Sequence, residues 1–111
     1  MKEISRRRKG RRLQNLLRNK ILTTFDILRP TDVRVAKTGE NGADIKMSKI
    51  ARRILPYQFE CKNQKRMSTI WTWYNQARKH GKLEPILVCK TNDRKPLVVL
   101  DLEAFFKIIK E

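Results

Sequence analysis

The hydrophobic pattern of this chain changes from a helical period to a strand-like one at Pro30. Before this proline, four aliphatic side chains recur at the spacing of one helix face, which predicts an amphipathic helix over about residues 5–22. After it come short alternating or apolar segments bounded by Gly, Pro, Asn or Asp, which predict strands. The aliphatic residues are Leu13, Leu16, Leu17 and Ile21, and the predicted strands span residues 33–36, 43–47, 57–61, 86–90 and 97–100.

Two more helices are predicted among and after these strands. Residues 68–80 contain no Pro or Gly, with Ser68 as the N-cap and Gly81 as the stop. A last helix begins after Asp101. This order of elements favours an α/β fold, and the length of 111 residues favours one domain over residues 1–111. The apolar faces are expected to hold Ile70, Trp73, Tyr74 and Ala77 in the first of these helices, and Leu102, Phe105, Phe106 and Ile109 in the second.

The charge of the chain indicates the kind of partner it binds. There are 27 Lys and Arg against 11 Asp and Glu, a net charge of +16. Residues 1–20 hold nine of the cations and one acid, so this segment alone carries +8. The imbalance predicts a polyanionic partner, whose phosphates the basic helix would bind with salt-dependent affinity and without reading sequence. A content of 40% apolar residues excludes a disordered basic tail.

Several classes of protein are excluded by what the sequence lacks. No apolar run approaches the roughly 20 residues of a membrane-spanning helix, and the opening MKEISRRRKGRR has no apolar middle typical of a secretory signal. We therefore expect a cytoplasmic protein in which Cys61 and Cys89 are free thiols. With two cysteines and the single histidine His80, no zinc site or histidine-based triad is expected. Metal chemistry would need oxygen ligands.

Two of the predicted strands carry polar side chains that can meet. The two-residue period places Glu60 and Lys62 on one face of their strand. It likewise places Asp44 and Lys46 together, so Asp44 can lie beside Glu60 if the two strands form a hairpin. Two carboxylates that converge with a lysine would bind a hard divalent cation such as Mg²⁺, which polarises a phosphodiester and lowers the pKa of a bound water.

These residues resemble a known motif. Gly-Ala-Asp44 followed by Glu60-Cys61-Lys62 resembles the motif of the PD-(D/E)XK nucleases, and the order of elements matches the αβββαβ core of that fold, with a central mixed sheet flanked by helices. With its small size and the basic stretch RKGRRLQ at residues 8–14, the chain is most similar to the archaeal-type Holliday junction resolvases and their phage-encoded relatives. The resemblance implies hydrolysis of DNA with Mg²⁺ or Mn²⁺, acting on four-way junctions. Because two opposed cuts are needed, it also implies a C2 homodimer.

The resemblance implies a role for each matching residue. Asp44 and Glu60 would bind the metal ion together with the backbone carbonyl of Cys61. Lys62 would orient the attacking water or help to deprotonate it.

Further contacts follow from the same resemblance. Gln14 stands where the resolvases usually carry a glutamate, and it would bind a metal-bound water or act as a weak ligand, with one negative charge fewer at the site. Glu40, in the loop before the motif, is a candidate to compensate. The expected DNA contacts are Arg6, Arg7, Arg8, Lys9, Arg11, Arg12, Lys65 and Arg66, with Gln76 on the helix that follows the motif.

Two alternative functions stay open. The chain could be a non-catalytic, basic nucleic-acid-binding protein in which Asp44 and Glu60 form structural ion pairs. It could also be a PD-(D/E)XK nicking or repair nuclease that acts on other DNA structures. His80 is interpreted as a surface residue beside a helix end. Candidates for a dimer interface are the exposed apolar residues of the last helix and Trp71.

Overall fold

A computed structural model describes the backbone of residues 2–63 and 70–110, and the side chains of residues 7–63, 70–101, 103–105, 107 and 108. Some predicted features therefore lie outside the described residues. They are Ser68, Lys65 and Arg66, and the side chains of Arg6, Leu102, Phe106 and Ile109.

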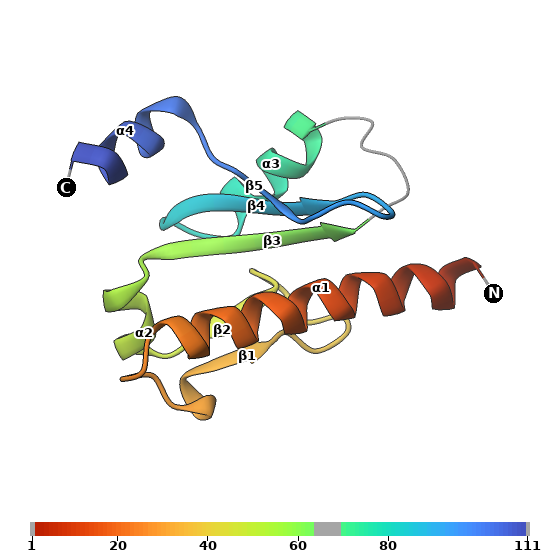
Figure 1. Cartoon of the computed structure of the whole chain (residues 1–111), viewed down its shortest axis with the longest axis horizontal. Helices are drawn as coiled ribbons and strands as arrows, with labels where there is room; N and C mark the ends of the chain where they lie inside the picture. The colour runs from red at the N-terminus through yellow and green to blue at the C-terminus, as the bar shows by residue number, and fades with distance from the viewer. Residues whose placement is uncertain (1, 64–69, 111) are drawn as a thin grey trace.

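The predicted α/β class is confirmed, and each predicted helix and strand is present (Figure 1). One helix was not predicted: α2 follows Ser48, whose hydroxyl oxygen caps it by accepting a hydrogen bond from the Ala51 N–H at 3.1 Å. In chain order the elements are α1 (Lys2–Thr24), the 3₁₀ turn η1 (Pro30–Asp32), β1 (Val33–Val35), β2 (Ile45–Met47), α2 (Lys49–Ile54), β3 (Tyr57–Asn63), α3 (Ile70–Lys79), β4 (Glu84–Lys90), β5 (Leu97–Val99) and α4 (Leu102–Lys110).

The described strands form two sheets. β3 pairs parallel with β4, and β4 pairs antiparallel with β5, so a mixed sheet of three strands is present in the order β3-β4-β5. β1 and β2 form a separate antiparallel pair in which Arg34 faces Lys46. Because α2 lies between β2 and β3, these two strands do not form a hairpin, and Asp44 reaches β3 in another way.

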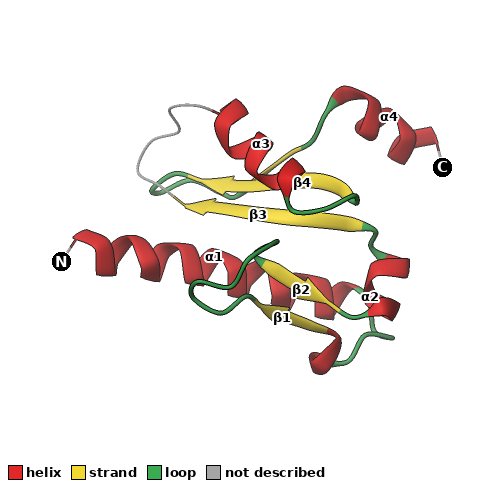
Figure 2. Cartoon of the chain, turned by 180° about the vertical axis from the view of Figure 1, so that it is seen from behind, coloured by secondary structure: helices red, strands yellow, loops and turns green. Residues whose placement is uncertain are grey.

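Helices α1 and α3 lie on opposite sides of the three-stranded sheet (Figures 1 and 2). On the α1 side, Leu13 and Ile21 belong to a core that also holds the inner residues of the small sheet. On the α3 side, Trp73 and Tyr74 pack against β4. The α1 core includes Val33, Ile45, Ala51, Phe59, Cys61, Ile86 and Val88, and the α3 core includes Leu87 and Cys89.

Three residues of the predicted apolar faces are exposed instead: Leu16, Ile70 and Phe105. Leu16 is 52% exposed, because the buried stripe of α1 steps by four residues from Leu13 through Leu17 to Ile21 and turns away from it. Ile70 is 41% exposed at the first position of α3. Trp71 lies off the buried stripe of α3, as predicted, and is 68% exposed.

The structure also bears on the state of the two cysteines and on whether a helix could cross a membrane. Cys61 and Cys89 are both buried free thiols, as expected. Among the helices of the described residues, none is both long and apolar enough to cross a membrane.

Candidate functional site

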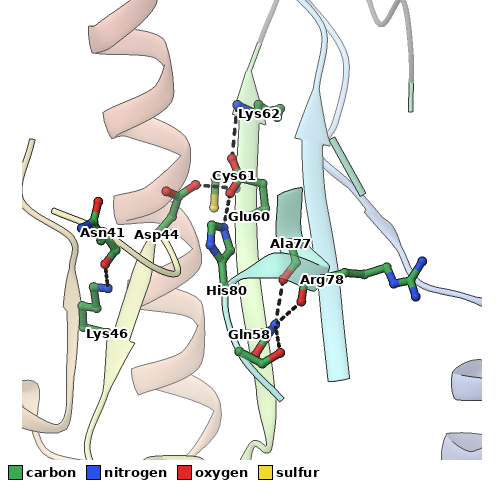
Figure 3. A network of polar contacts seen from close by, with 11 residues as sticks. Asn41, Asp44, Lys46, Gln58, Glu60, Cys61, Lys62, Ala77, Arg78 and His80 are labelled. Atoms are coloured by element: carbon green, nitrogen blue, oxygen red, sulfur yellow. Dashed lines mark hydrogen bonds and ion pairs between the residues drawn. The ribbon is translucent and has the colours of Figure 1, made fainter. Parts of the chain in front are cut away.

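Asp44 is held against the outer edge of β3. Its Oδ2 accepts a hydrogen bond from the Cys61 N–H at 2.8 Å, and its own N–H donates to the Phe59 carbonyl at 3.0 Å (Figure 3). Its carbonyl accepts from the N–H of Ala36 at 2.8 Å. The residue just before β2 thus joins the small sheet to β3, and its carboxylate lies beside the strand that carries Glu60.

Glu60 is buried, and both of its carboxylate oxygens have a partner. Oε2 lies 3.2 Å from Lys62 Nζ, and Oε1 lies 2.5 Å from His80 Nε2. Because an ionised carboxylate can only accept hydrogen bonds, His80 donates its Nε2–H to Oε1, whereas Lys62 forms an ion pair with Oε2. Figure 3 shows Glu60 between Lys62 on one side and His80 on the other. The side chains of Glu60 and Lys62 therefore meet on one side of β3, as the two-residue period predicts.

His80 is the residue that the sequence analysis missed. It was interpreted as a surface residue, yet its side chain is 17% exposed and contacts Glu60. The contact follows from the parallel pairing of β3 with β4, which no local sequence pattern shows. In a parallel pair, the crossover through α3 must return the chain to the end of the sheet where both strands begin. A residue at the end of that helix therefore arrives beside the first half of β3.

Gln58 fixes this return of the chain. Its side chain is buried, and its Nε2 donates to the carbonyls of Ala77 at 2.8 Å and Gly81 at 3.1 Å, so it caps the end of α3 (Figure 3). Its Oε1 accepts from the N–H of Leu83 at 3.0 Å. A Cβ at Gly81 would come within 2.9 Å of this oxygen, so a side chain there would shift the Gln58 amide. These bonds hold the segment that carries His80.

The electrostatic environment of Asp44 favours a cation. Burial is the main cause that raises the pKa of this carboxyl, and the negative charge of Glu60 raises it further, against the opposing effects of the Cys61 N–H and of the charges on Lys62 and His80. Burial also raises the pKa of the Cys61 thiol, as do the charges of the two carboxylates. The negative charge of Glu60 is thus close enough to disfavour the ionised form of Asp44.

The donor set at this edge fits a hard divalent cation. Asp44 Oδ1 has no hydrogen-bond donor among the described residues. The Cys61 carbonyl points to the same edge as the Cys61 N–H, since both groups of one strand residue point to the same side. Within residues 2–63 and 70–110, no three His, Cys, Asp or Glu side chains group closely enough to hold a metal alone. Mg²⁺ commonly uses one or two carboxylates and completes its shell with water or phosphate oxygens, which Asp44, Glu60 and the carbonyl would allow.

The two remaining candidates of the metal site do not reach these carboxylates. Gln14 is half-buried on α1 and makes no hydrogen bond within the described part of the chain. Glu40 is bound by the Arg34 guanidinium at 2.9 and 2.8 Å and by the Lys37 N–H at 2.8 Å. These bonds, the Arg34 side chain first, lower the pKa of Glu40 to about 2. Glu40 is thus held by a neighbouring arginine instead of compensating for Gln14.

Two of the cations that were expected to contact DNA, Lys9 and Arg12, line a cleft at the end of β3 that carries Asn63. Its volume is about 410 Å³, and it lies between the first half of α1 and the end of β4, with Lys9, Arg12, Asn63 and Lys90 in its lining. Lys9 Nζ donates to the Asn92 side chain at 2.8 Å. Gln76 is exposed on α3, on the opposite side of the sheet from these residues (Figure 2). Arg7, Arg8 and Arg11 are exposed on α1.

Comparisons of the chain with models of protein families, with curated proteins and with solved structures give no match. Its function is therefore argued from the geometry of the site.

Proposed function

We propose that this chain is a metal-dependent DNA endonuclease of the PD-(D/E)XK type. The observation that carries the proposal is the hydrogen bond from the Cys61 N–H to Asp44, because it brings an acidic side chain from another sheet to the strand that bears Glu60 and Lys62. The order α1, β1, β2, β3, α3, β4 supports the proposal, since it follows the αβββαβ core with α2 inserted before the third strand.

Each residue has a distinct part in the proposed reaction. Asp44, Glu60 and the Cys61 carbonyl would hold Mg²⁺ or Mn²⁺. When bound, the ion supplies a Lewis acid for the phosphodiester and lowers the pKa of a water. Lys62, whose Nζ lies 3.2 Å from Glu60, would orient the attacking water and stabilise the negative charge that develops on the phosphodiester. His80 positions Glu60 from the other side.

We extend the proposal to four-way DNA junctions cut by a homodimer. Two opposed incisions need two sites, and each copy of the chain would supply one. Leu97, Val98 and Ile108 are exposed apolar residues on β5 and α4 that a second copy could cover. Residues 97–111 hold three acids and two lysines, so two copies of an otherwise strongly basic chain would not repel each other there. Light scattering at micromolar concentration should give twice the mass of one chain.

The test compares a labelled four-way junction with a linear duplex of the same sequence. We expect paired symmetric cuts in the junction with Mg²⁺, none with EDTA, and none with Asp44→Asn, Glu60→Gln or Lys62→Ala. Asp26→Asn, which removes an exposed carboxylate in the loop after α1, is the matched control and should cut like the wild type.

Two other results would assign the alternative functions. A wild type that binds DNA but cuts nothing would indicate a nucleic-acid-binding protein. Equal cutting of the junction and the duplex would indicate a nicking or repair nuclease. Calorimetric titration with Mn²⁺ in the absence of DNA measures the metal site independently of cleavage.

A further inference from the structure

We propose that a second basic cleft, at the start of β3, binds a phosphate group of a nucleic-acid backbone. The cleft has a volume of about 290 Å³, and its lining includes Lys46, Arg52, Lys82 and His80 but no acidic residue. The assignment of this nucleic acid as DNA rests on the proposed function. The preference for a phosphate group rests on the cleft alone.

The cations of this cleft come from three separate parts of the chain, and none forms an ion pair with a carboxylate of the described residues, although the charge of Lys46 acts on Glu40. Lys46 on β2 donates to the Asn41 carbonyl, and Arg52 on α2 donates to the Met47 carbonyl at 2.7 Å. Lys82, in the loop between α3 and β4, makes no hydrogen bond or ion pair with the described residues. Bonds to carbonyls hold Lys46 and Arg52 in place, and the charges of Arg52 and Lys82 have no carboxylate partner among the described residues. Such a concave group of cations favours an anion.

Glycine keeps one wall of the cleft open. The backbone of Gly42 has a φ of +93°, and a Cβ there would come within 2.7 Å of Lys46 Nζ. A side chain at this position would therefore displace the ammonium group from its place in the cleft. The next residue, Ala43, also lines the cleft and directly precedes Asp44.

The position of the cleft ties it to the candidate metal site. His80 lines the cleft and contacts Glu60, so the cleft opens beside the carboxylates. Gln58 lines this cleft and Asn63 lines the one beside α1. At a rise of roughly 3.3 Å per residue, these positions on β3 are about 17 Å apart, close to the rise of five base pairs. The two clefts therefore lie toward opposite ends of β3.

A phosphate suits this arrangement better than other anions. Arg52 presents a planar set of donors that can bind two phosphate oxygens at once, while the two lysines act as point charges. Phosphates on a polymer release condensed counterions when cations bind them. The affinity therefore falls steeply with salt concentration, which is not expected for a single carboxylate.

The experiment measures DNA binding without metal, so that cleavage plays no part. Fluorescence anisotropy in EDTA follows binding of a labelled duplex to wild type, Arg52→Gln and Lys82→Gln between 50 and 200 mM KCl. For each substitution we expect the slope of log K against log salt to become less negative by about 0.9, and the affinity at 0.1 M salt to fall roughly five- to tenfold. Arg53→Gln and Lys79→Gln remove exposed cations outside the cleft, and they are the matched controls, with slopes like the wild type.

Several outcomes would overturn the proposal. Wild-type slopes for Arg52→Gln and Lys82→Gln, or equal changes in the two controls, would show that no phosphate is bound in the cleft. If Arg52→Gln and Lys82→Gln reduce the affinity for poly-glutamate as much as the affinity for DNA, the cleft binds anions in general and has no preference for phosphate. A wild type that does not bind DNA would overturn both this site and the proposed function, whereas DNA binding without cleavage would overturn only the latter. Thermal melting of each variant confirms that it is folded.

Discussion

His80 Nε2 lies 2.5 Å from Glu60 Oε1, although the two residues are 20 positions apart in the chain. The parallel pairing of β3 with β4 and the cap that Gln58 provides on α3 bring them together. Glu60 is therefore held at both oxygens, by His80 on one side and Lys62 on the other.

We expect His80→Ala to lower kcat for cleavage at least tenfold and to change KM less, because Glu60 loses the donor that fixes one of its oxygens. His80→Gln should recover part of the loss, since its amide can donate to the same oxygen. Steady-state kinetics on a junction substrate would measure both. A wild-type kcat for His80→Ala would show that the contact does not position Glu60.

Gln58→Ala should lower the free energy of unfolding by about 2–4 kcal/mol, because it leaves the Leu83 N–H and the carbonyls at the end of α3 without their buried partner. Urea denaturation with an unchanged m value would measure the loss. Gln76→Ala, an exposed change on α3, is the matched control and should stay within about 0.5 kcal/mol. Equal effects of the two substitutions would refute the capping role.

Asp44→Asn should raise the melting temperature of the metal-free protein at pH 7 by about 3 °C while abolishing cleavage. Burial raises the pKa of Asp44, so its charge opposes folding above that pKa, and the difference from wild type should shrink as the pH falls below it. Asparagine can still accept the hydrogen bond of Cys61.

Asp32→Asn should instead lower the melting temperature, because hydrogen bonds from the Arg29 N–H and Ser48 lower the pKa of Asp32. Calorimetry of both variants would check the opposite signs.

The ion pair of Arg34 with Glu40 should stabilise the protein only when Glu40 is ionised. The pKa of Glu40 is lowered from 4.5 to about 2, so this contribution is fully present above pH 4.5 and is lost as the pH falls from 4.5 toward 2. The difference in melting temperature between wild type and Glu40→Gln should follow the same course. Because the pair is exposed, 1 M NaCl should reduce the difference at pH 7. A difference that persists at pH 2 would contradict the assignment.

Local patterns were sufficient for much of the fold. The helical spacing of Leu13, Leu17 and Ile21 and the two-residue alternation around Glu60 depend only on neighbours in sequence, and both features are present. The contact of Asp44 with β3 was expected for a different reason, a hairpin, and it arises from a hydrogen bond to the edge of β3 across the inserted helix α2.

The remaining features depend on how distant segments pack. Six residues from Lys49 to Ile54 are too few for a clear helical period, so α2 was missed. The partner of His80 depends on the direction of pairing between β3 and β4, which no local pattern of either strand reveals. The cleft at Arg52 joins residues of β2, α2 and a later loop, and nothing in any one segment marks it.

The hydrogen bonds of Asp44 to β3 also bear on aggregation. β3 is the outer strand of its sheet, and the unpaired backbone groups of an outer strand are a template on which another chain can add a strand. Asp44 occupies two of these groups, the Cys61 N–H and the Phe59 carbonyl. The residue that we propose binds a metal thus also blocks the edge of the sheet, so detachment of the loop before β2 would expose the protein to intermolecular strand addition as well as disrupt the proposed metal site.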